Sequence, residues 1–141
     1  MKRIASAVRK GGLKDGNGTL TTDSGVLRET KYSFGTRFEN AAGTNPEELI
    51  GAAHAGCFSM ALSAQLEAVG LKAESIRTSA TVTLDVAGNG PTISAVHLDV
   101  AAHVPGAERQ AFEAAAERAK TGCPVSKALN AKITMAATLE A

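Results

Sequence analysis

The chain has 141 residues, of which 44% are apolar and 21% are charged, as in an ordinary globular protein. This length favours a single domain, residues 1–141, with a core of its own. A net charge of +1 without a block of like charges argues against nucleic acid and anionic membranes as partners. The first residues, MKRIASAVRKGG, lack the apolar segment of a signal peptide. We therefore expect a cytoplasmic protein.

The first part of the chain, residues 3–38, is predicted to form an antiparallel meander. A short strand at Ile4–Val8 leads into the turn-rich segment KGGLKDGNG, and Thr19–Thr22 and Val26–Leu27 flank a second turn. Residues 31–38 (KYSFGTRF) alternate in polarity and are predicted as the last strand. The aromatic residues of that strand share one face, and Arg37 lies on the other.

A long helix is predicted within residues 43–70. It begins with TNPEE, in which Thr or Asn can cap the helix, Pro suits the first turn, and Glu favours the positive end. Leu49–Leu66 contains no Asp, Glu, Lys or Arg, and Gly70 suits a left-handed stop. A helix that is apolar nearly all round must be buried on several sides, so we expect it at the centre of the fold. Ala, Gly, Ser, His and Gln dilute it, which favours a core helix over a membrane span.

The second half of the chain predicts two further strands, two helices and a closing strand. The segments rich in β-branched residues, Ile76–Val86 and Ile93–Val104, flank the turn GNGP and form a hairpin. Strong helix formers then end at Gly122. The remaining elements are a helix at Ala107–Lys120, a short helix at Val125–Asn130 and a strand at Ile133–Leu139. This order of elements argues for an α+β fold rather than a doubly wound parallel sheet.

Two cysteines, Cys57 and Cys123, are too few for a secreted disulfide scaffold, and neither lies in a zinc-binding pattern. Burial in the long helix would raise the pKa of Cys57 and leave it inert, and the helix dipole is too far away to help. If Cys57 reacts, tertiary structure must bring a cation to it. Cys123 precedes a Pro that fits a first helical turn, so free backbone N–H groups favour it as the readier thiolate. Inert packing of Cys57 and a structural cap role for Cys123 remain open.

The histidines offer one further candidate. His54 lies three residues before Cys57 on roughly the same helix face, so a nucleophile–base pair is conceivable. Packing in the core is favoured, since no third group that would orient the ring is evident. His97 and His103 fall on one side of the predicted hairpin and are expected at the surface.

Arg37, Glu47 and Glu48 gather around the start of the long helix. One interpretation is a solvated helix start, in which the glutamates favour the helix dipole. The other is an arginine held by a carboxylate and aimed at a thiolate or a substrate oxygen. The sequence weighs these two interpretations equally.

The segments TRFEN, GTNPEELIGAAHAGCFSMAL and AKTGCPVSKAL closely resemble the OsmC family, thiol peroxidases related to the organic hydroperoxide resistance proteins. The resemblance covers essentially the whole chain. It implies that Cys57 is the peroxidatic cysteine, whose thiolate attacks the peroxide O–O bond, and that Cys123 resolves the sulfenic acid as an intrachain disulfide. It also implies that Arg37 stabilises the thiolate and polarises the peroxide, and that Glu47 holds the arginine. The early segment KGGLKDG lacks arginine, which favours the OsmC branch.

The resemblance further implies a fold and partners. The fold would be α+β, with antiparallel strands wrapped around long central helices in an intertwined homodimer that has two sites at the subunit interface. Organic hydroperoxides would be the substrates, with hydrogen peroxide poorer, in defence against oxidative and osmotic stress. A dithiol, often a dihydrolipoyl protein in this family, would be the reductant, and no cofactor or metal is implied.

Several alternatives remain open at this stage. An apolar pocket for an alkyl peroxide is hypothesised from Phe34, Phe38, Phe58 and Met60. A redox sensor or thiol-binding protein of the same fold would not turn over peroxide. A hydrolase would use Cys57 with His54 and would be indifferent to the loss of Cys123.

Overall fold

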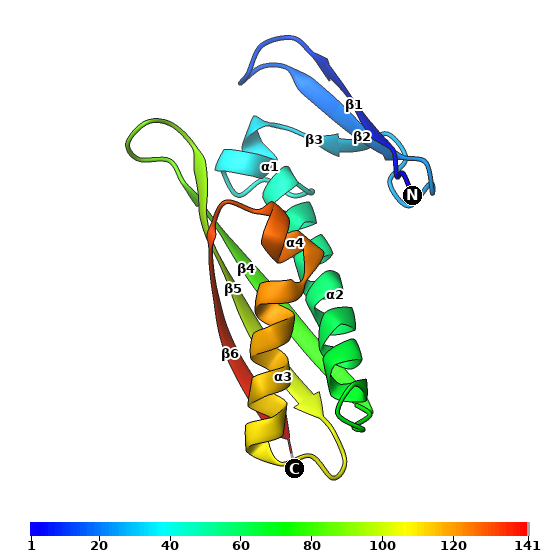
Figure 1. The fold of residues 1–141 in the computed structure, drawn as a ribbon. Helices are drawn as coiled ribbons and strands as arrows, with labels where there is room; N and C mark the ends of the chain where they lie inside the picture. The colour runs from blue at the N-terminus through cyan, green and yellow to red at the C-terminus, as the bar shows by residue number, and fades with distance from the viewer. Residues whose placement is uncertain (141) are drawn as a thin grey trace. The chain divides into compact units, whose positions relative to one another are not determined.

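The computed structural model describes residues 1–140 (Figure 1). The chain divides into two compact units, Met1–Leu49 (unit 1) and the residues from Ile50 onward (unit 2).

Unit 1 contains a three-stranded antiparallel sheet in the order β1-β2-β3, which confirms the predicted meander. Gly25, in the turn after β2, has a φ of +80°, a conformation that suits glycine. The strands are β1 (Ala5–Lys10), β2 (Asn17–Thr22) and β3 (Thr30–Tyr32).

The predicted strand at residues 31–38 is wrong beyond Tyr32, because the chain turns into the short helix α1 (Phe34–Phe38). Ser33 caps this helix reciprocally with Thr36. The Thr36 N–H donates to Ser33 Oγ (3.2 Å), and the Ser33 N–H donates to Thr36 Oγ1 (2.9 Å). The aromatic residues that simulated strand alternation are instead neighbours one helical turn apart, with Phe34 and Phe38 ring centroids separated by 5.0 Å. Arg37 therefore lies on a helix.

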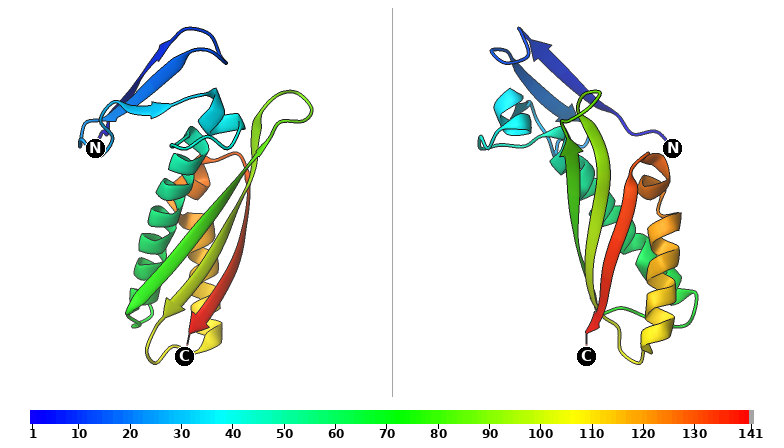
Figure 2. Two further views of the ribbon diagram at one scale, coloured as in Figure 1. Left: turned by 180° about the vertical axis from the view of Figure 1, so that it is seen from behind. Right: turned by 90° about the vertical axis from the view of Figure 1, so that its left-hand side faces the viewer.

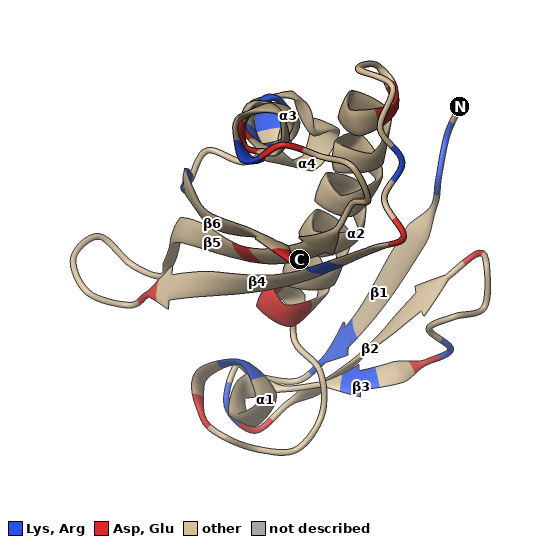
Figure 3. Ribbon diagram, turned by 90° about the horizontal axis from the view of Figure 1, so that it is seen from below, with Lys and Arg blue, Asp and Glu red and all other residues tan. Residues whose placement is uncertain are grey.

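The long helix is confirmed as α2 (Pro46–Glu67). Asn45 Oδ1 accepts the backbone N–H of Glu48 at 2.8 Å, which satisfies one of the free donors of the first turn. Gly70, with a φ of +79°, lies just beyond its end, as the sequence predicts. Figure 3 shows α2 almost free of charge between its acidic first turn and its end.

Unit 2 contains a mixed three-stranded sheet in the order β4-β5-β6. The hairpin of β4 (Ser75–Asp85) and β5 (Thr92–His103) is antiparallel, as predicted. The last strand, β6 (Lys132–Glu140), pairs with β5 in parallel, so the expectation of antiparallel strands is wrong for this pair. Parallel neighbours need a crossover. Here α3 (Arg109–Gly122) and α4 (Pro124–Ala128) provide it.

The core of unit 2 lies between this sheet and two helices that cover the same face of it, α2 and α3 (Figures 1 and 2). Alternate β5 residues point into this core, while the residues between them, which include His97 and His103, lie on the partly exposed opposite side. The helices contribute small and aromatic side chains that pack closely. The fully buried core includes Phe58, Leu62, Leu66, Val96, Leu98, Ala102, Phe112, Ala115 and Ala116.

Within the single chain, α2 buries one stripe rather than several sides. Gly51, His54, Phe58, Leu62 and Leu66 recur at helical spacing and are buried. The opposite side exposes mostly small apolar residues together with one large one. These are Ala52, Ala53, Gly56, Met60 and Ala64. The α2 helix thus presents an apolar face that the described residues of unit 2 leave uncovered.

By length and composition, α2 is also apolar enough to cross a membrane. However, polar side chains of α2 form hydrogen bonds with other elements of unit 2. Ser59 Oγ lies 2.7 Å from Thr78 Oγ1 on β4, and Arg118 on α3 donates to Gln65 Oε1 at 2.8 Å. A helix that packs on a sheet and bonds to its neighbours in this way belongs to the core of the fold.

Candidate functional site

Two thiols from distant parts of the sequence meet in unit 2. Cys57 lies in the middle of α2, and Cys123 lies between the end of α3 and the first residue of α4. Their Sγ atoms are 2.8 Å apart, and both cysteines are free. Cys123 is fully buried, whereas Cys57 is partly exposed. The two thiols are therefore in direct contact, and solvent reaches the pair from the Cys57 side.

The surroundings of the two thiols favour different protonation states. Burial raises the pKa of Cys57, and the hydrogen bond with Cys123 raises it further. Burial also opposes ionisation of Cys123, but hydrogen bonds from the Cys57 thiol, from Ser126 and from the Val125 N–H outweigh it and lower the pKa of Cys123. Within unit 2, the pKa of Cys123 is thus lowered and that of Cys57 is raised.

His54 is a buried histidine that bonds to Ser126 rather than to Cys57. Its Nε2 lies 2.7 Å from Ser126 Oγ, and within residues 1–140 its Nδ1 has no hydrogen-bond partner. Burial lowers the pKa of His54, so the imidazole is neutral at neutral pH. The interpretation of His54 as a packed core residue is supported. A role as the base of Cys57 is not.

Arg37 and Glu47 form an ion pair in unit 1, at the first turn of α2. Glu47 Oε1 accepts from both Nε (3.0 Å) and Nη2 (2.9 Å) of Arg37. The glutamate side chain is 9% exposed and the arginine side chain 37%, so the carboxylate is the fixed partner and the guanidinium extends from it. Glu48 instead accepts a hydrogen bond from Thr44. This favours the interpretation of an arginine held by a carboxylate over that of a solvated helix start.

Ser126 is the residue of this region that the sequence analysis missed. It is the third residue of α4, three positions after Cys123. The available signal was the spacing of the two residues. Cys123 directly precedes the helix and Ser126 follows three positions later, so their side chains lie on one side of the helix start.

The residues proposed for an apolar peroxide pocket do not share one environment. Phe58 is fully buried in the core of unit 2, whereas Met60 on the same helix is 77% exposed. Phe34 and Phe38 pack on each other in unit 1, and the Arg37 guanidinium lies 5.2 Å from the Phe38 ring centroid. Phe58 is therefore a core residue rather than a pocket residue.

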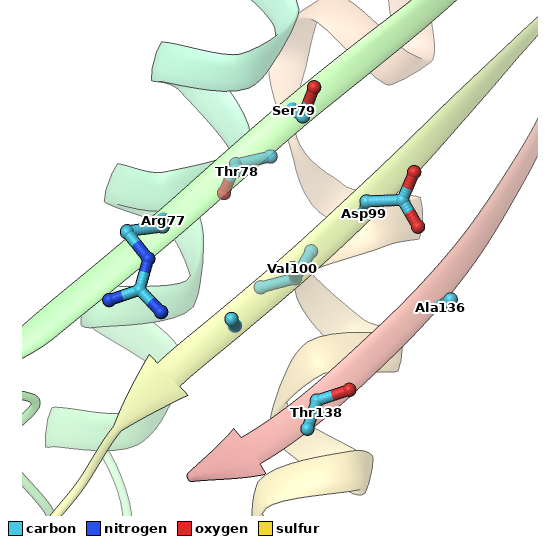
Figure 4. Close-up of a pocket in the computed structure, with 8 residues that line it drawn as sticks. Arg77, Thr78, Ser79, Asp99, Val100, Ala136 and Thr138 are labelled. Atoms are coloured by element: carbon cyan, nitrogen blue, oxygen red, sulfur yellow. The ribbon is translucent and has the colours of Figure 1, made fainter.

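Other possible sites are less suited to chemistry. Across residues 1–140, no three His, Cys, Asp or Glu side chains cluster in a way that could hold a metal ion. A hollow of about 380 Å³ lies over β4, β5 and β6 (Figure 4). Its charged side chains are Arg77, which pairs with Glu140, and Asp99, 3.4 Å from His97. None of the residues that line it carries a thiol.

An α+β domain with two free thiols in contact has the architecture of a thiol-based redox protein. The family model described as OsmC-like protein matches residues 38–138. Over 126 residues, the chain is 50% identical to Peroxiredoxin OsmC of Escherichia coli, a match that covers 89% of this chain and 88% of that protein. The chain belongs to the OsmC family, and it is an enzyme of the peroxidase class.

Solved structures support the fold independently. The OsmC-like protein of Mycoplasma pneumoniae superposes with a TM-score of 0.77 at 16% identity, over 100% of this chain and 99% of that one. An organic hydroperoxide resistance protein of Elizabethkingia anophelis superposes with a TM-score of 0.75 at 24% identity, over 99% of each chain. At these identities the likeness concerns the fold alone. It confirms the expected α+β architecture with a long helix against the sheet.

Proposed function

We propose that the protein is a cysteine-based peroxidase that reduces organic hydroperoxides, with hydrogen peroxide a poorer substrate, in defence against oxidative and osmotic stress. The observation that supports this most directly is the contact of 2.8 Å between Cys57 and Cys123. A peroxidatic thiol needs a second thiol within reach if its sulfenic acid is to close as a disulfide. The relative named Peroxiredoxin OsmC, which is 50% identical to this chain, supports the peroxidase reaction.

In the proposed reaction, the Cys57 thiolate attacks one oxygen of the hydroperoxide and the O–O bond breaks. Cys57 becomes a sulfenic acid, and the alkoxide takes a proton and leaves as an alcohol. The Cys123 sulfur then attacks the Cys57 sulfur. The sulfenic hydroxyl leaves with the thiol proton as water, and a disulfide remains. A dithiol, such as that of a dihydrolipoyl protein, reduces the disulfide to two thiols and is itself oxidised.

Arg37 is proposed to supply the cation that Cys57 needs. Both influences that dominate the pKa of Cys57 within unit 2 raise it, so its thiolate needs a positive group from elsewhere. Arg37 is permanently charged, and the buried Glu47 carboxylate fixes its orientation through two hydrogen bonds to one oxygen. The pair leaves Nη1 of Arg37 outside the ion pair, available for a thiolate or a peroxide oxygen.

A homodimer with two sites at the subunit interface is part of the same proposal. The uncovered apolar face of α2 supports it, as does β1, all six residues of which are exposed in the single chain. A second copy would remove apolar area from water on both elements. We also propose that residues 1–141 act as one peroxidase domain in the cytoplasm.

Steady-state turnover tests the proposal. Peroxide consumption with dihydrolipoamide as reductant should be abolished in Cys57→Ser. Cys123→Ser should allow one oxidation of Cys57 and then stop. Full activity of Cys57→Ser would contradict the mechanism. A protein that oxidises once but never turns over would instead be a redox sensor.

A further inference from the structure

Two contacts, one helical turn apart, join α2 to the segment that carries Cys123. One is the Cys57–Cys123 contact of 2.8 Å, and the other is the contact of 2.7 Å between His54 Nε2 and Ser126 Oγ. His54 lies three residues before Cys57, and Ser126 lies three residues after Cys123. Residues three apart share a helix face, so the two contacts run side by side. Ser126 is thus held beside the sulfur pair by a buried histidine.

The hydrogen bonding of His54 fixes its tautomer. A neutral imidazole carries one N–H donor and one acceptor nitrogen. In the part of the chain that the structure describes, Nδ1 is buried and has no partner, whereas Nε2 has Ser126. A buried N–H without a partner is rarer in proteins than an under-satisfied acceptor. The proton therefore resides on Nε2, and Nε2–H donates to Ser126 Oγ.

This donation determines where the Ser126 hydroxyl points. If His54 accepted from Ser126, the hydroxyl proton would lie between the oxygen and the ring. With His54 as the donor, the hydroxyl proton is free to turn to another acceptor. The Cys123 sulfur is the acceptor nearest in the chain, because Cys123 directly precedes α4 and Ser126 is the third residue of that helix, on the same side of its start. Of the titratable groups on α2, Cys57 contacts Cys123 directly, and His54 contacts Ser126.

We propose that His54 is a positioning residue: its Nε2–H turns the Ser126 hydroxyl toward Cys123 and so favours the thiolate that closes the disulfide. The role of this thiolate as the resolving group rests on the proposed function. His54 itself touches neither peroxide nor the reacting sulfurs. Hydrogen bonding to an anion favours it over the neutral thiol, and the lowered pKa of Cys123 agrees with this arrangement.

The first test measures the pKa of Cys123 directly, in a Cys57→Ser background, from the rate of alkylation against pH. Ser126→Ala and His54→Leu should each raise this pKa by about one unit, which is about a tenfold loss of thiolate at neutral pH. His54→Gln, whose side-chain amide can still donate an N–H, should keep the pKa close to its original value. The double variant His54→Leu/Ser126→Ala should lose no more than either single variant, since the two residues act through one hydrogen bond.

An unchanged pKa in Ser126→Ala, a mild truncation that should fold, would overturn the proposal even if His54→Leu is unstable. Nitrogen NMR of the imidazole in the unmodified protein adds an independent reading. An Nε2–H tautomer supports the proposal, and an Nδ1–H tautomer overturns it.

Single-turnover kinetics separate this proposal from the proposed function. In Ser126→Ala, oxidation of Cys57 by cumene hydroperoxide should keep its rate while disulfide closure slows about tenfold. Equal closure rates would overturn the role of the pair while leaving the peroxidase intact. If Cys57→Ser still consumes peroxide, the proposed peroxidase mechanism is overturned. The His54 tautomer and the pKa of Cys123 would still test the role of His54 in that case.

Discussion

Unit 2 shifts the pKa values of its two cysteines in opposite directions. Burial opposes ionisation of Cys123, but hydrogen bonding with Cys57 and at the start of α4 lowers its pKa, whereas burial raises the pKa of Cys57. A peroxidatic role for Cys57 therefore requires a charge that unit 2 does not supply to it. The ion pair of Arg37 with the buried Glu47 is the candidate source of that charge.

Arg37→Ala tests this requirement. An opposite charge near a thiol lowers its pKa by about 1–3 units, so loss of the guanidinium should raise the pKa of Cys57 accordingly. Oxidation by cumene hydroperoxide at neutral pH should slow at least about tenfold. Stopped-flow oxidation and a thiol titration in a Cys123→Ser background measure the two effects.

Arg37→Lys is the matched control, because it keeps the charge and loses the planar guanidinium that carries both hydrogen bonds to Glu47. It should fall between the original protein and Arg37→Ala. Glu47→Gln should act in the same direction as Arg37→Ala, since it frees the guanidinium from its fixed partner. A pKa of Cys57 that is indifferent to all three changes would remove Arg37 from the mechanism.

The lowered pKa of the buried His54 predicts how the free energy of unfolding depends on pH. Burial lowers the pKa of His54 in the folded state below that of the unfolded chain, about 6.5. Below that pH, the unfolded chain binds the proton more readily. The stability contributed by neutral His54 is thus fully present above the unfolded pKa and is lost as pH falls through the folded pKa.

Urea unfolding at pH 7 and pH 5 measures this effect. The difference in unfolding free energy between the two pH values should shrink in His54→Gln, which does not titrate. An equal difference in both proteins would assign the acid sensitivity to other groups.

Only part of the site follows from local sequence signals. The lowered pKa of Cys123 agrees with the Pro that follows it, which marks a helix start. The contact between Cys57 and Cys123 joins residues 66 apart, and no local signal predicts it; the resemblance to the OsmC family did. The His54–Ser126 hydrogen bond spans 72 residues and went unpredicted for the same reason.

At the scale of the elements, the predictions that succeeded rest on strong periodicity and clear end signals. The bounds of α2 follow from its cap and Gly70, and the β4–β5 hairpin from its alternation and its Gly-rich turn. The strand predicted at residues 31–38 was wrong because the spacing of its aromatic residues fits both the strand period and the helix period. The reciprocal capping of Ser33 and Thr36 stabilises the helix instead. The parallel pairing of β6 depends on the crossover through α3, which is a tertiary choice.

The buried stripe of α2 predicts which substitutions in unit 2 should lower the free energy of unfolding. Leu62 is fully buried between α2 and the sheet, so Leu62→Ala should destabilise the fold by about 2–5 kcal/mol through lost burial and a residual cavity. Leu13 is 66% exposed, and Leu13→Ala should leave the unfolding free energy within about 0.5 kcal/mol of the original. Denaturant unfolding of both variants makes the comparison. Equal losses would contradict the assignment of the core.

At the scale of the whole molecule, the single chain exposes apolar surface on α2 and β1 that a second copy of the chain would bury. The outward side of α2 carries exposed small residues and Met60, and β1 exposes every residue. Small side chains allow another helix to approach closely, which suits a second copy of the same chain. A homodimer is therefore expected in solution.

Met60→Glu tests this expectation. A charge buried in a subunit interface without a partner costs several kcal/mol, so the variant should dissociate or weaken the dimer. Light scattering after size-exclusion chromatography should give twice the chain mass for the original protein and a lower mass for the variant. Val86→Glu, at a residue 64% exposed beside the hairpin turn, should leave the dimer unchanged. A monomeric original protein would contradict the expectation.

The proposed mechanism requires Cys57 and Cys123 to act as one redox pair, and peptide mass spectrometry after one equivalent of cumene hydroperoxide tests this most directly. We expect a crosslinked peptide that joins Cys57 to Cys123, absent in Cys57→Ser and in Cys123→Ser and reversed by dihydrolipoamide. Two thiols that stay reduced while peroxide is consumed, or a Cys57 that proceeds to sulfinic acid without the crosslink, would contradict it.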